Sequence, residues 1–291
     1  MTSVPMKNKL RQDTRTPDIS FIILTWNSEK YIEKCLFSYE KSLFEQGKTA
    51  EFIIIDNGST DKTANLLEQV VKPFLPACCT LDLVKLGKNY GTTVSRNIGI
   101  KKARGEVIVI CDSDTELIQG EWSIIFSLLK NNQQIGVIAP SLFYENGEIQ
   151  HSVKKFPTLT EKLKKVLKIL FDLPVKNEDF YENFPWKHPT TVDSAISACW
   201  ILLKETIEKI GLLDEKIFYS PEDLDYCLRM WEGGKQVLYY PDMQVIHHTQ
   251  QITHNKPFSP QSISHLTGLF YYFLKHRYCF SRHRLYKRLN Q

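Results

Sequence analysis

Apolar runs and polar segments alternate regularly through the first half of this chain. The runs are rich in Val and Ile, and each has the length of a short strand. They cover residues 19–25, 51–57, 81–87 and 106–112. Continuous apolar runs of this kind indicate strands that are buried on both faces of a sheet.

The segments between these runs have the spacing of helices. One helix is expected to open near residues 27–28, and others cover residues 61–71 and 91–103. Ser59 or Thr60 can cap the helix that begins at residue 61. Strands that alternate with helices at this spacing predict an α/β fold with a mainly parallel central sheet flanked by helices. Ligands of such sheets bind at the carboxyl ends of the strands.

The second half of the chain has a less regular pattern. It predicts a strand and turn at residues 136–150 and a Lys-rich helix at 160–173, inside a variable loop of residues 157–190. A longer strand is expected at 192–204, followed by a short helix and by strands at 236–241 and 243–248. An amphipathic stretch at 265–289 comes last.

Three parts of the chain are expected from these patterns. Residues 1–17 form a polar tail, residues 18–250 form the main domain, and residues 251–291 form a basic, amphipathic helical extension. Within the main domain, residues 18–115 are the half expected to bind a ligand at the strand ends, and residues 116–250 are the other half.

Composition narrows the classes of function. The net charge is +4 over 291 residues, which is too small for the basic footprint of a nucleic-acid-binding protein. The seven cysteines include no CxxC pair, which argues against a zinc knuckle or disulfide scaffold and fits a reducing compartment such as the cytoplasm. The first residues lack the apolar core of a secretory signal, and the apolar runs are too short to span a membrane.

Carboxylates follow two of the predicted strands. Asp56 ends the second strand, and Asp112 and Asp114 flank Ser113 at the end of the fourth. Residues i and i+2 of an extended segment point to the same side, so this pair could hold Mg²⁺ or Mn²⁺. The same residue types are also common in turns, and the pattern alone favours neither interpretation.

Two further groups carry possible chemistry. Glu222 and Asp223 follow Pro221 at a predicted helix start, where they either stabilise the helix dipole or supply a general base. His247 ends a strand beside His248, and it could be a metal ligand or a hydrogen-bonded core histidine.

A Gly-punctuated turn precedes the helix of residues 91–103. This turn is basic, and Lys88, Asn89, Gly91, Arg96 and Asn97 could hold a phosphate at the start of the helix. The dinucleotide-binding and P-loop glycine patterns are both missing from it.

Taken in order, these segments resemble the family 2 glycosyltransferases, which are inverting enzymes with the GT-A fold. The matching strings are FIILTWNSEKYIEKCL, IIIDNGSTDKT, NYGTTVSRNIGIKKARGEVIVICDSDTE and PEDLDYCLRMWEGGKQVLYYPDMQVIHH. The resemblance covers roughly residues 18–250 and is nearest to the branch of bacterial rhamnosyltransferases.

The resemblance implies a metal-dependent sugar transfer from a UDP-, dTDP- or GDP-linked donor to a glycan or lipid-linked acceptor. It implies Mn²⁺ or Mg²⁺ held by Asp114, Asp112 and His247, and a catalytic pair in which Asp223 is the base beside Glu222. It also implies a set of donor-binding residues, with Asp56 on the base and Arg96 near the phosphates. That set is Thr25, Trp26, Asn27, Asp56, Asn57, Asn89, Gly91, Arg96, Asp112 and Ser113.

Other functions are compatible with parts of the pattern. A sugar-1-phosphate nucleotidyltransferase also combines acids with Mg²⁺, but it should have a Gly-rich basic loop where this chain has TWNSEKY. A degenerate module could bind a nucleotide or glycan without turnover. The terminal stretch 265–289 either packs on the domain or attaches it peripherally to an anionic membrane, at the inner face if the protein is cytoplasmic.

Overall fold

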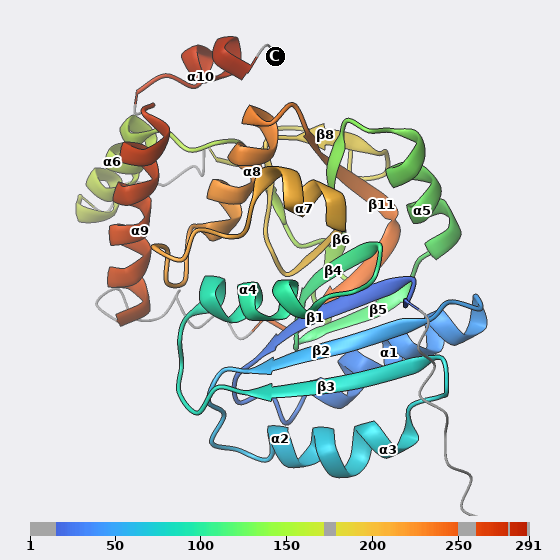
Figure 1. Ribbon diagram of the computed structural model, residues 1–291. Helices are drawn as coiled ribbons and strands as arrows, with labels where there is room; N and C mark the ends of the chain where they lie inside the picture. The colour runs from blue at the N-terminus through green and yellow to red at the C-terminus, as the bar shows by residue number, and fades with distance from the viewer. Residues whose placement is uncertain (1–15, 172–178, 250–259, 279, 290–291) are drawn as a thin grey trace, which may run out of the picture.

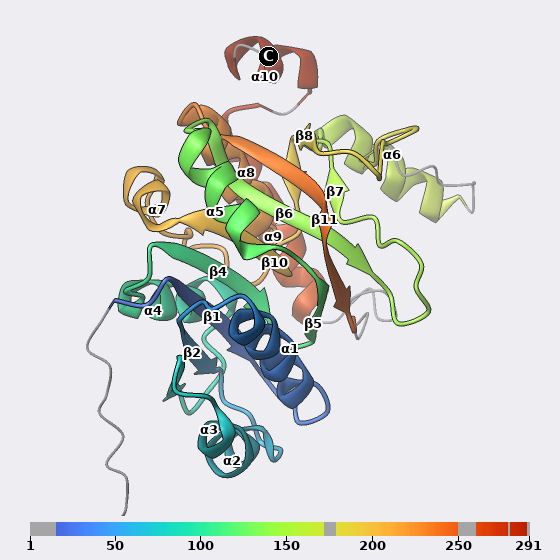
Figure 2. The same cartoon turned by 90° about the vertical axis from the view of Figure 1, so that its right-hand side faces the viewer.

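A central sheet lies between two layers of helices in the computed structural model (Figures 1 and 2). The structure describes residues 16–171, 179–249, 260–278 and 280–289. One face of the sheet packs on α1, η1 and α5, and the other packs on α4, α7, α8, α9 and α10. The expected tail of residues 1–17 and the start of the expected extension lie mostly outside the described residues.

The strands of the main sheet are joined in the order β3-β2-β1-β4-β10-β6-β11-β5, and β8 pairs with β11. A separate small sheet joins β7 and β9. The strands are β1 (Ile19–Thr25), β2 (Ala50–Asp56), β3 (Cys79–Lys85), β4 (Val107–Asp112), β5 (Thr115–Gln119), β6 (Ile135–Phe143), β7 (Val153–Lys154), β8 (Thr190–Val192), β9 (Ser194–Ala195), β10 (Cys199–Leu203) and β11 (Gln236–His247).

The helices vary from single turns to the long helix α9. They are α1 (Ile32–Glu45), α2 (Thr63–Leu66), the π-helical turn η1 (Leu67–Val71), α3 (Lys72–Phe74), α4 (Thr92–Lys102), α5 (Trp122–Asn131), α6 (Leu159–Leu170), α7 (Lys204–Ile210), α8 (Glu222–Glu232), α9 (Pro260–His276) and α10 (Arg282–Leu289). Within the described residues, no helix is long and apolar enough to cross a membrane.

The four strands expected in the first half are confirmed. β3, β2, β1 and β4 pair in parallel, and β1, β2 and β4 are buried over nearly their whole length because their runs are apolar on both faces. Their carboxyl ends therefore meet at one edge, where β1 ends at Thr25, β2 at Asp56 and β4 at Asp112.

The second half extends the sheet with mixed strand directions. β10 lies antiparallel between β4 and β6, while β11 runs parallel to β6 and antiparallel to β5. The strands expected at residues 236–241 and 243–248 are one strand, β11, with a shift in register between Tyr240 and Gln244. The strand expected over residues 192–204 is broken into β9 and β10, and β5 was not expected at all.

Helix starts in the first half also differ from the expectation. The helix expected near residues 27–28 begins at Ile32, and Asn27 has a left-handed backbone with φ 52°. The helix after β2 begins at Thr63 without a side-chain cap, because Ser59 instead accepts a hydrogen bond from the Asn27 backbone N–H at 2.9 Å. These polar side chains connect two loops at the carboxyl edge of the sheet and do not cap a helix.

Candidate active site

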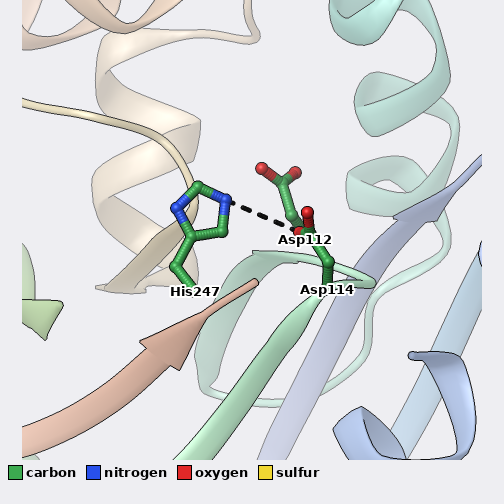
Figure 3. A group of neighbouring side chains, drawn as sticks. All are labelled: Asp112, Asp114 and His247. Atoms are coloured by element: carbon green, nitrogen blue, oxygen red, sulfur yellow. Dashed lines mark ion pairs between the residues drawn. The ribbon is translucent and has the colours of Figure 1, made fainter. Parts of the chain in front are cut away.

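Three possible metal ligands converge at the carboxyl edge of the sheet (Figure 3). Asp112 and Asp114 follow β4, and His247 ends β11. One ligand atom from each residue lies within 4.8 Å of the others, and Asp114 Oδ1 is 3.6 Å from His247 Nε2. Strand pairing brings Asp114 and His247 together. β5 begins directly after Asp114 and pairs with β11, so that Thr115 lies opposite His247.

The imidazole of His247 is oriented for ligation. Its Nδ1 lies 3.0 Å from Oε1 of Gln150, an oxygen that can only accept a hydrogen bond. Donation from Nδ1 to this oxygen leaves Nε2, which lies 3.6 Å from Asp114 Oδ1, as the nitrogen available to a metal. Metal-ligating histidines are usually fixed by such an outer partner.

The electrostatics of the two carboxylates also suit a cation. Burial and the neighbouring charge of Asp112 raise the pKa of Asp114 to about 6, and nearby His247 only partly opposes them. A divalent cation between the two carboxylates would relieve this repulsion and return Asp114 to its charged form. The residues present therefore fit a divalent metal with oxygen and imidazole ligands.

Arg96 joins this cluster to the start of α8. Its side chain is buried, and its Nη2 donates a hydrogen bond of 2.6 Å to Asp112 Oδ1. Its Nη1 donates to Glu222 Oε1 at 3.2 Å and to Ser197 Oγ at 2.7 Å. The guanidinium thus connects the end of β4 with the first residue of α8.

The two acids at the start of α8 have different surroundings. Glu222 is buried, and its Oε1 also accepts a hydrogen bond from Ser197 Oγ at 2.8 Å. Burial and the adjacent Asp223 raise the pKa of Glu222 to about 7, although the charge of Arg96 opposes this rise. Asp223 is only half-buried, and its Oδ1 accepts a hydrogen bond from the backbone N–H of Leu224 at 2.8 Å.

The ends of β1 and β2 form a second polar group beside the cluster. Asp56 is buried and its Oδ1 accepts a hydrogen bond from the backbone N–H of Ser59 at 3.0 Å, while Asn27 Oδ1 accepts one from that of Thr60 at 2.8 Å. Thr25 Oγ1 is buried without a hydrogen-bond partner among the described residues. A buried hydroxyl of this kind is costly, so it suggests that a polar ligand completes the pocket.

The loop before α4 extends this group. Asn57 Oδ1 accepts a hydrogen bond from the backbone N–H of Tyr90 at 2.8 Å, and Asn57 Nδ2 donates to Asn89 Oδ1 at 3.0 Å. Gly91 has φ 85°, and a Cβ there would lie 2.3 Å from the carbonyl oxygen of Phe218. Only glycine allows this close approach between the loop and the segment that leads to α8.

The remaining two expected donor-binding residues lie at the same edge. Ser113 Oγ is 2.7 Å from Ser28 Oγ, which ties the turn after β4 to the loop after β1. Trp26 is exposed in that loop. The structure thus brings the expected residues together as two adjoining groups: one around Asp112 and Arg96, the other around Asp56 and Asn57.

Sequence reasoning missed three residues of the site. Gln150 orients His247, Ser197 binds both Arg96 and Glu222, and Tyr219 lies just before α8. Partial burial, and after it the charges of Asp112 and Glu222, raise the pKa of Tyr219 to about 12. None of the three belongs to a local motif, so only the tertiary pairing of the strands reveals them.

Comparisons with known proteins identify a family and a fold. The family described as glycosyl transferase family 2 matches residues 20–211. Among curated relatives, the low-salt glycan biosynthesis hexosyltransferase Agl10 of Haloferax volcanii is 24% identical over 226 residues, which are 75% of this chain and 63% of Agl10. The match covers only 16% to 64% of the first three curated relatives, so this chain spans less than two thirds of their length.

Two solved structures share the architecture. GalNAc-T7 with UDP, GalNAc and Mn²⁺ superposes with a TM-score of 0.66 at 16% identity, covering 89% of this chain and 48% of that one. The mannosyltransferase PcManGT from Pyrobaculum calidifontis, in complex with GDP-Man and Mn²⁺, has a TM-score of 0.56 at 16% identity. That match covers 91% of this chain and 65% of PcManGT.

Proposed function

Because this chain belongs to glycosyltransferase family 2 and has the GT-A fold expected from its sequence, we propose that it is a metal-dependent, inverting glycosyltransferase. It moves a hexosyl or deoxyhexosyl group from a nucleotide-diphosphate donor to a hydroxyl of a glycan or lipid-linked saccharide. Its proposed role is in the synthesis of cell-surface polysaccharide. The observation that carries the proposal is the convergence of Asp112, Asp114 and His247 beside the acids that begin α8.

Asp114, Asp112 and His247 are the proposed ligands of the divalent cation, which is Mn²⁺ or Mg²⁺. When bound, the cation supplies Lewis-acid stabilisation of the negative charge on the departing nucleoside diphosphate. The imidazole in this set favours Mn²⁺, because nitrogen ligands suit it better than Mg²⁺.

The donor would lie along the carboxyl edge of β1, β2 and β4. Thr25, Asn27 and Asp56 are proposed to line the nucleoside pocket, and the unpartnered hydroxyl of Thr25 supports a polar ligand there. The proposed nucleotide is UDP, dTDP or GDP, and on this fold GalNAc-T7 binds UDP and PcManGT binds GDP-Man. The proposed nearness to rhamnosyltransferases favours a deoxyhexose donor.

Asp223 is the proposed general base, and Glu222 is its buried neighbour. The carboxylate of Asp223 would take the proton of the acceptor hydroxyl as that oxygen bonds to the anomeric carbon. The bond from that carbon to the diphosphate breaks on the opposite side, which inverts its configuration. Glu222 is already bound to Arg96 and Ser197, so it supports the site rather than receives the proton.

A donor screen tests this function directly. Purified protein with Mn²⁺ or Mg²⁺ would be incubated with UDP-, dTDP- and GDP-sugars, recording thermal stabilisation and nucleotide release. We expect one nucleotide class to stabilise the protein only with metal, together with slow metal-dependent hydrolysis of its sugar. Asp223→Asn should lower turnover by roughly 10²–10⁴-fold while leaving nucleotide stabilisation intact.

The same screen separates the alternatives. A degenerate binding module would be stabilised by a nucleotide or glycan without any release. A nucleotidyltransferase would form a nucleotide sugar and pyrophosphate from a sugar 1-phosphate and a nucleoside triphosphate. Either result would replace the transferase proposal.

A reducing compartment is part of the proposal. The six described cysteines are free thiols, which supports a place in the cytoplasm. Residues 18–115 and 116–250 are then the donor and acceptor halves of the transferase, and residues 251–291 are an extension of it.

A further inference from the structure

The two faces of α9 have the same apolar character but opposite exposure. The inner face packs into the core beside α8 through Leu269, Tyr272 and Phe273. The outer face consists of Leu266, Phe270 and Leu274, which are 60%, 67% and 59% exposed. Spacing of four residues places these three side chains in one stripe along the helix.

The inner face of α9 also contacts the segment that leads to the catalytic pair. A Cβ on Gly268 would lie 2.2 Å from the carbonyl oxygen of Ser220, so the helix backbone touches this segment. His265 Nδ1 is 2.9 Å from Ser220 Oγ. Glu222 follows two residues later, and therefore only the width of α9 separates its exposed stripe from the start of α8.

The segment that carries the stripe contains basic but no acidic residues, although its Lys275, Arg282 and Arg288 are paired with acids of other segments. From residue 243 to the end, the chain has seven Lys or Arg residues and no Asp or Glu. Several of these cations are exposed close after the stripe, namely Arg277 at the end of α9 and Arg284 and Lys287 on α10. Phe280, between the two helices, is 72% exposed.

We propose that α9 and α10 dock this protein on an anionic lipid bilayer. The stripe of Leu266, Phe270 and Leu274 would enter the boundary between headgroups and acyl chains, while Arg284 and Lys287 would bind anionic headgroups. A second copy of the chain is a poorer partner for this surface, since a two-fold contact would bring its unbalanced positive charges together.

A second helix on the same side extends the proposed surface. α6 and α9 both lie at the left of the molecule in Figure 1, while the labels of β1, β2 and β3 lie to their right. Leu163, Leu167 and Phe171, each four residues apart, are exposed along α6 and just after it. Lys164 of this helix is also exposed.

If the proposed transferase function is right, this orientation explains how a lipid-linked acceptor reaches the base. The segment through Ser220 touches the membrane-facing helix on one side and precedes Asp223 on the other. The acceptor hydroxyl would then approach from the lipid surface, while a water-soluble donor enters at the ends of β1 and β2.

Vesicle binding tests the surface without reference to turnover. The full chain would be sedimented with vesicles of phosphatidylcholine, alone or mixed with phosphatidylglycerol. We expect recovery with the mixed vesicles only, and Phe270→Ser should lower the partition coefficient by roughly tenfold or more. The control is Phe74→Ser on α3, where the side chain is 73% exposed and lies away from α9, and it should leave binding unchanged.

The contribution of the positive charges is tested with separate variants and a matched control. Arg284→Gln and Lys287→Gln should each weaken binding by about fivefold, and added salt should do the same for the wild type. Lys41→Gln removes an exposed charge from α1 and should have no effect. Circular dichroism of each variant confirms that loss of binding is not loss of folding.

Three outcomes would overturn this proposal. They are no binding to anionic vesicles, equal binding to neutral ones, or binding that Phe270→Ser and Phe74→Ser weaken alike. Sedimentation velocity adds a fourth, a dimer that Phe270→Ser dissociates, which would make the stripe a self-association surface. Vesicle binding without any donor turnover would leave the membrane proposal standing and overturn only the transferase function.

Discussion

Arg96 Nη2 lies 2.6 Å from Asp112 Oδ1, and the same guanidinium reaches Glu222 through its other terminal nitrogen. A residue of α4 thus fixes a proposed metal ligand at the end of β4 relative to the first residue of α8. The planar fork of Arg allows one side chain to bind two carboxylates in a fixed geometry, and Lys has no equivalent.

Arg96→Lys should therefore lower turnover even though it keeps the positive charge. An ammonium can approach only one of Asp112 and Glu222 closely, so the other loses its partner. We expect a loss of about 10–100-fold in turnover, as for other residues that orient metal ligands. Donor hydrolysis at saturating metal measures it.

The matched control for that change is Arg104→Lys. Arg104 forms a comparable two-nitrogen contact with the buried Glu51, at the opposite end of the strands. Its replacement should leave turnover unchanged. Equal losses in both variants would mean that Arg96 supports folding in general and not the site.

Removal of the metal should abolish nucleotide binding as well as turnover. A nucleotide at 100 times its dissociation constant stabilises a protein by about 2.7 kcal/mol, which thermal unfolding detects readily. We expect EDTA to remove this stabilisation, and Asp114→Asn to lack it at any metal concentration. Asp82→Asn, which removes an exposed carboxylate paired with Lys102, should behave as the wild type. Nucleotide binding that survives EDTA would contradict the proposal that the donor diphosphate binds through the metal.

The contact between α9 and α8 should give stability that depends on pH. Burial opposes a charge on His276, but its hydrogen bonds with Asp225 and Glu232 outweigh burial and raise its pKa above 6.5. The protonated ring therefore stabilises the folded state below the unfolded pKa, and this contribution is lost as the pH rises through the folded value.

Comparison with His276→Gln tests this sign. The difference in melting temperature between wild type and variant should be largest near pH 6 and shrink toward about pH 9. His283→Gln, at an exposed position of α10, should show no such trend. A difference that grows with pH would mean that the ring is neutral in the folded state.

Gly268→Ala separates helix propensity from steric contact. Alanine favours a helix interior by roughly 1 kcal/mol over glycine, so propensity alone predicts stabilisation. A Cβ at this position would instead meet the carbonyl oxygen of Ser220 at 2.2 Å, and overpacking of this kind costs about 1–3 kcal/mol. We expect net destabilisation and a lower turnover, because α9 must move away from the segment before Glu222.

Urea unfolding of this variant and donor hydrolysis measure the two effects. Leu266→Ala changes the outer face of the same helix and should alter neither. A more stable and fully active Gly268→Ala protein would show that α9 does not constrain the segment before the proposed base.

The sequence predicted the parallel half of the sheet, β3-β2-β1-β4, because the signals for these strands are local. Each run from β1 to β4 is apolar on both faces, and the acid that follows β2 or β4 marks the carboxyl edge without any tertiary information. Helix starts were less predictable. Asn27, Ser59 and Thr60 are all good capping residues, but they bind one another across two loops, and no propensity describes such a pairing.

The other half of the sheet, β10-β6-β11-β5, depends on strand pairing that local sequence patterns do not contain. β5 has five residues, and it is a strand because β11 lies beside it. The residue types of the proposed metal site were visible in the sequence, whereas the outer partner Gln150 was not. Likewise, Arg96 was expected near the phosphates from a local basic turn, and its contact with Glu222 across 126 positions required the fold.

The pairing of β5 with β11 has a consequence for how tightly the proposed site can hold an ion. His247 lies opposite Thr115, and the backbone N–H of His248 donates a hydrogen bond to the carbonyl oxygen of Asp114 at 2.8 Å. Main-chain bonds thus hold ligands more than 130 positions apart before an ion arrives, and little conformational entropy remains to be lost on coordination. Such a preorganised centre should bind an ion more tightly than a site that becomes ordered only on binding.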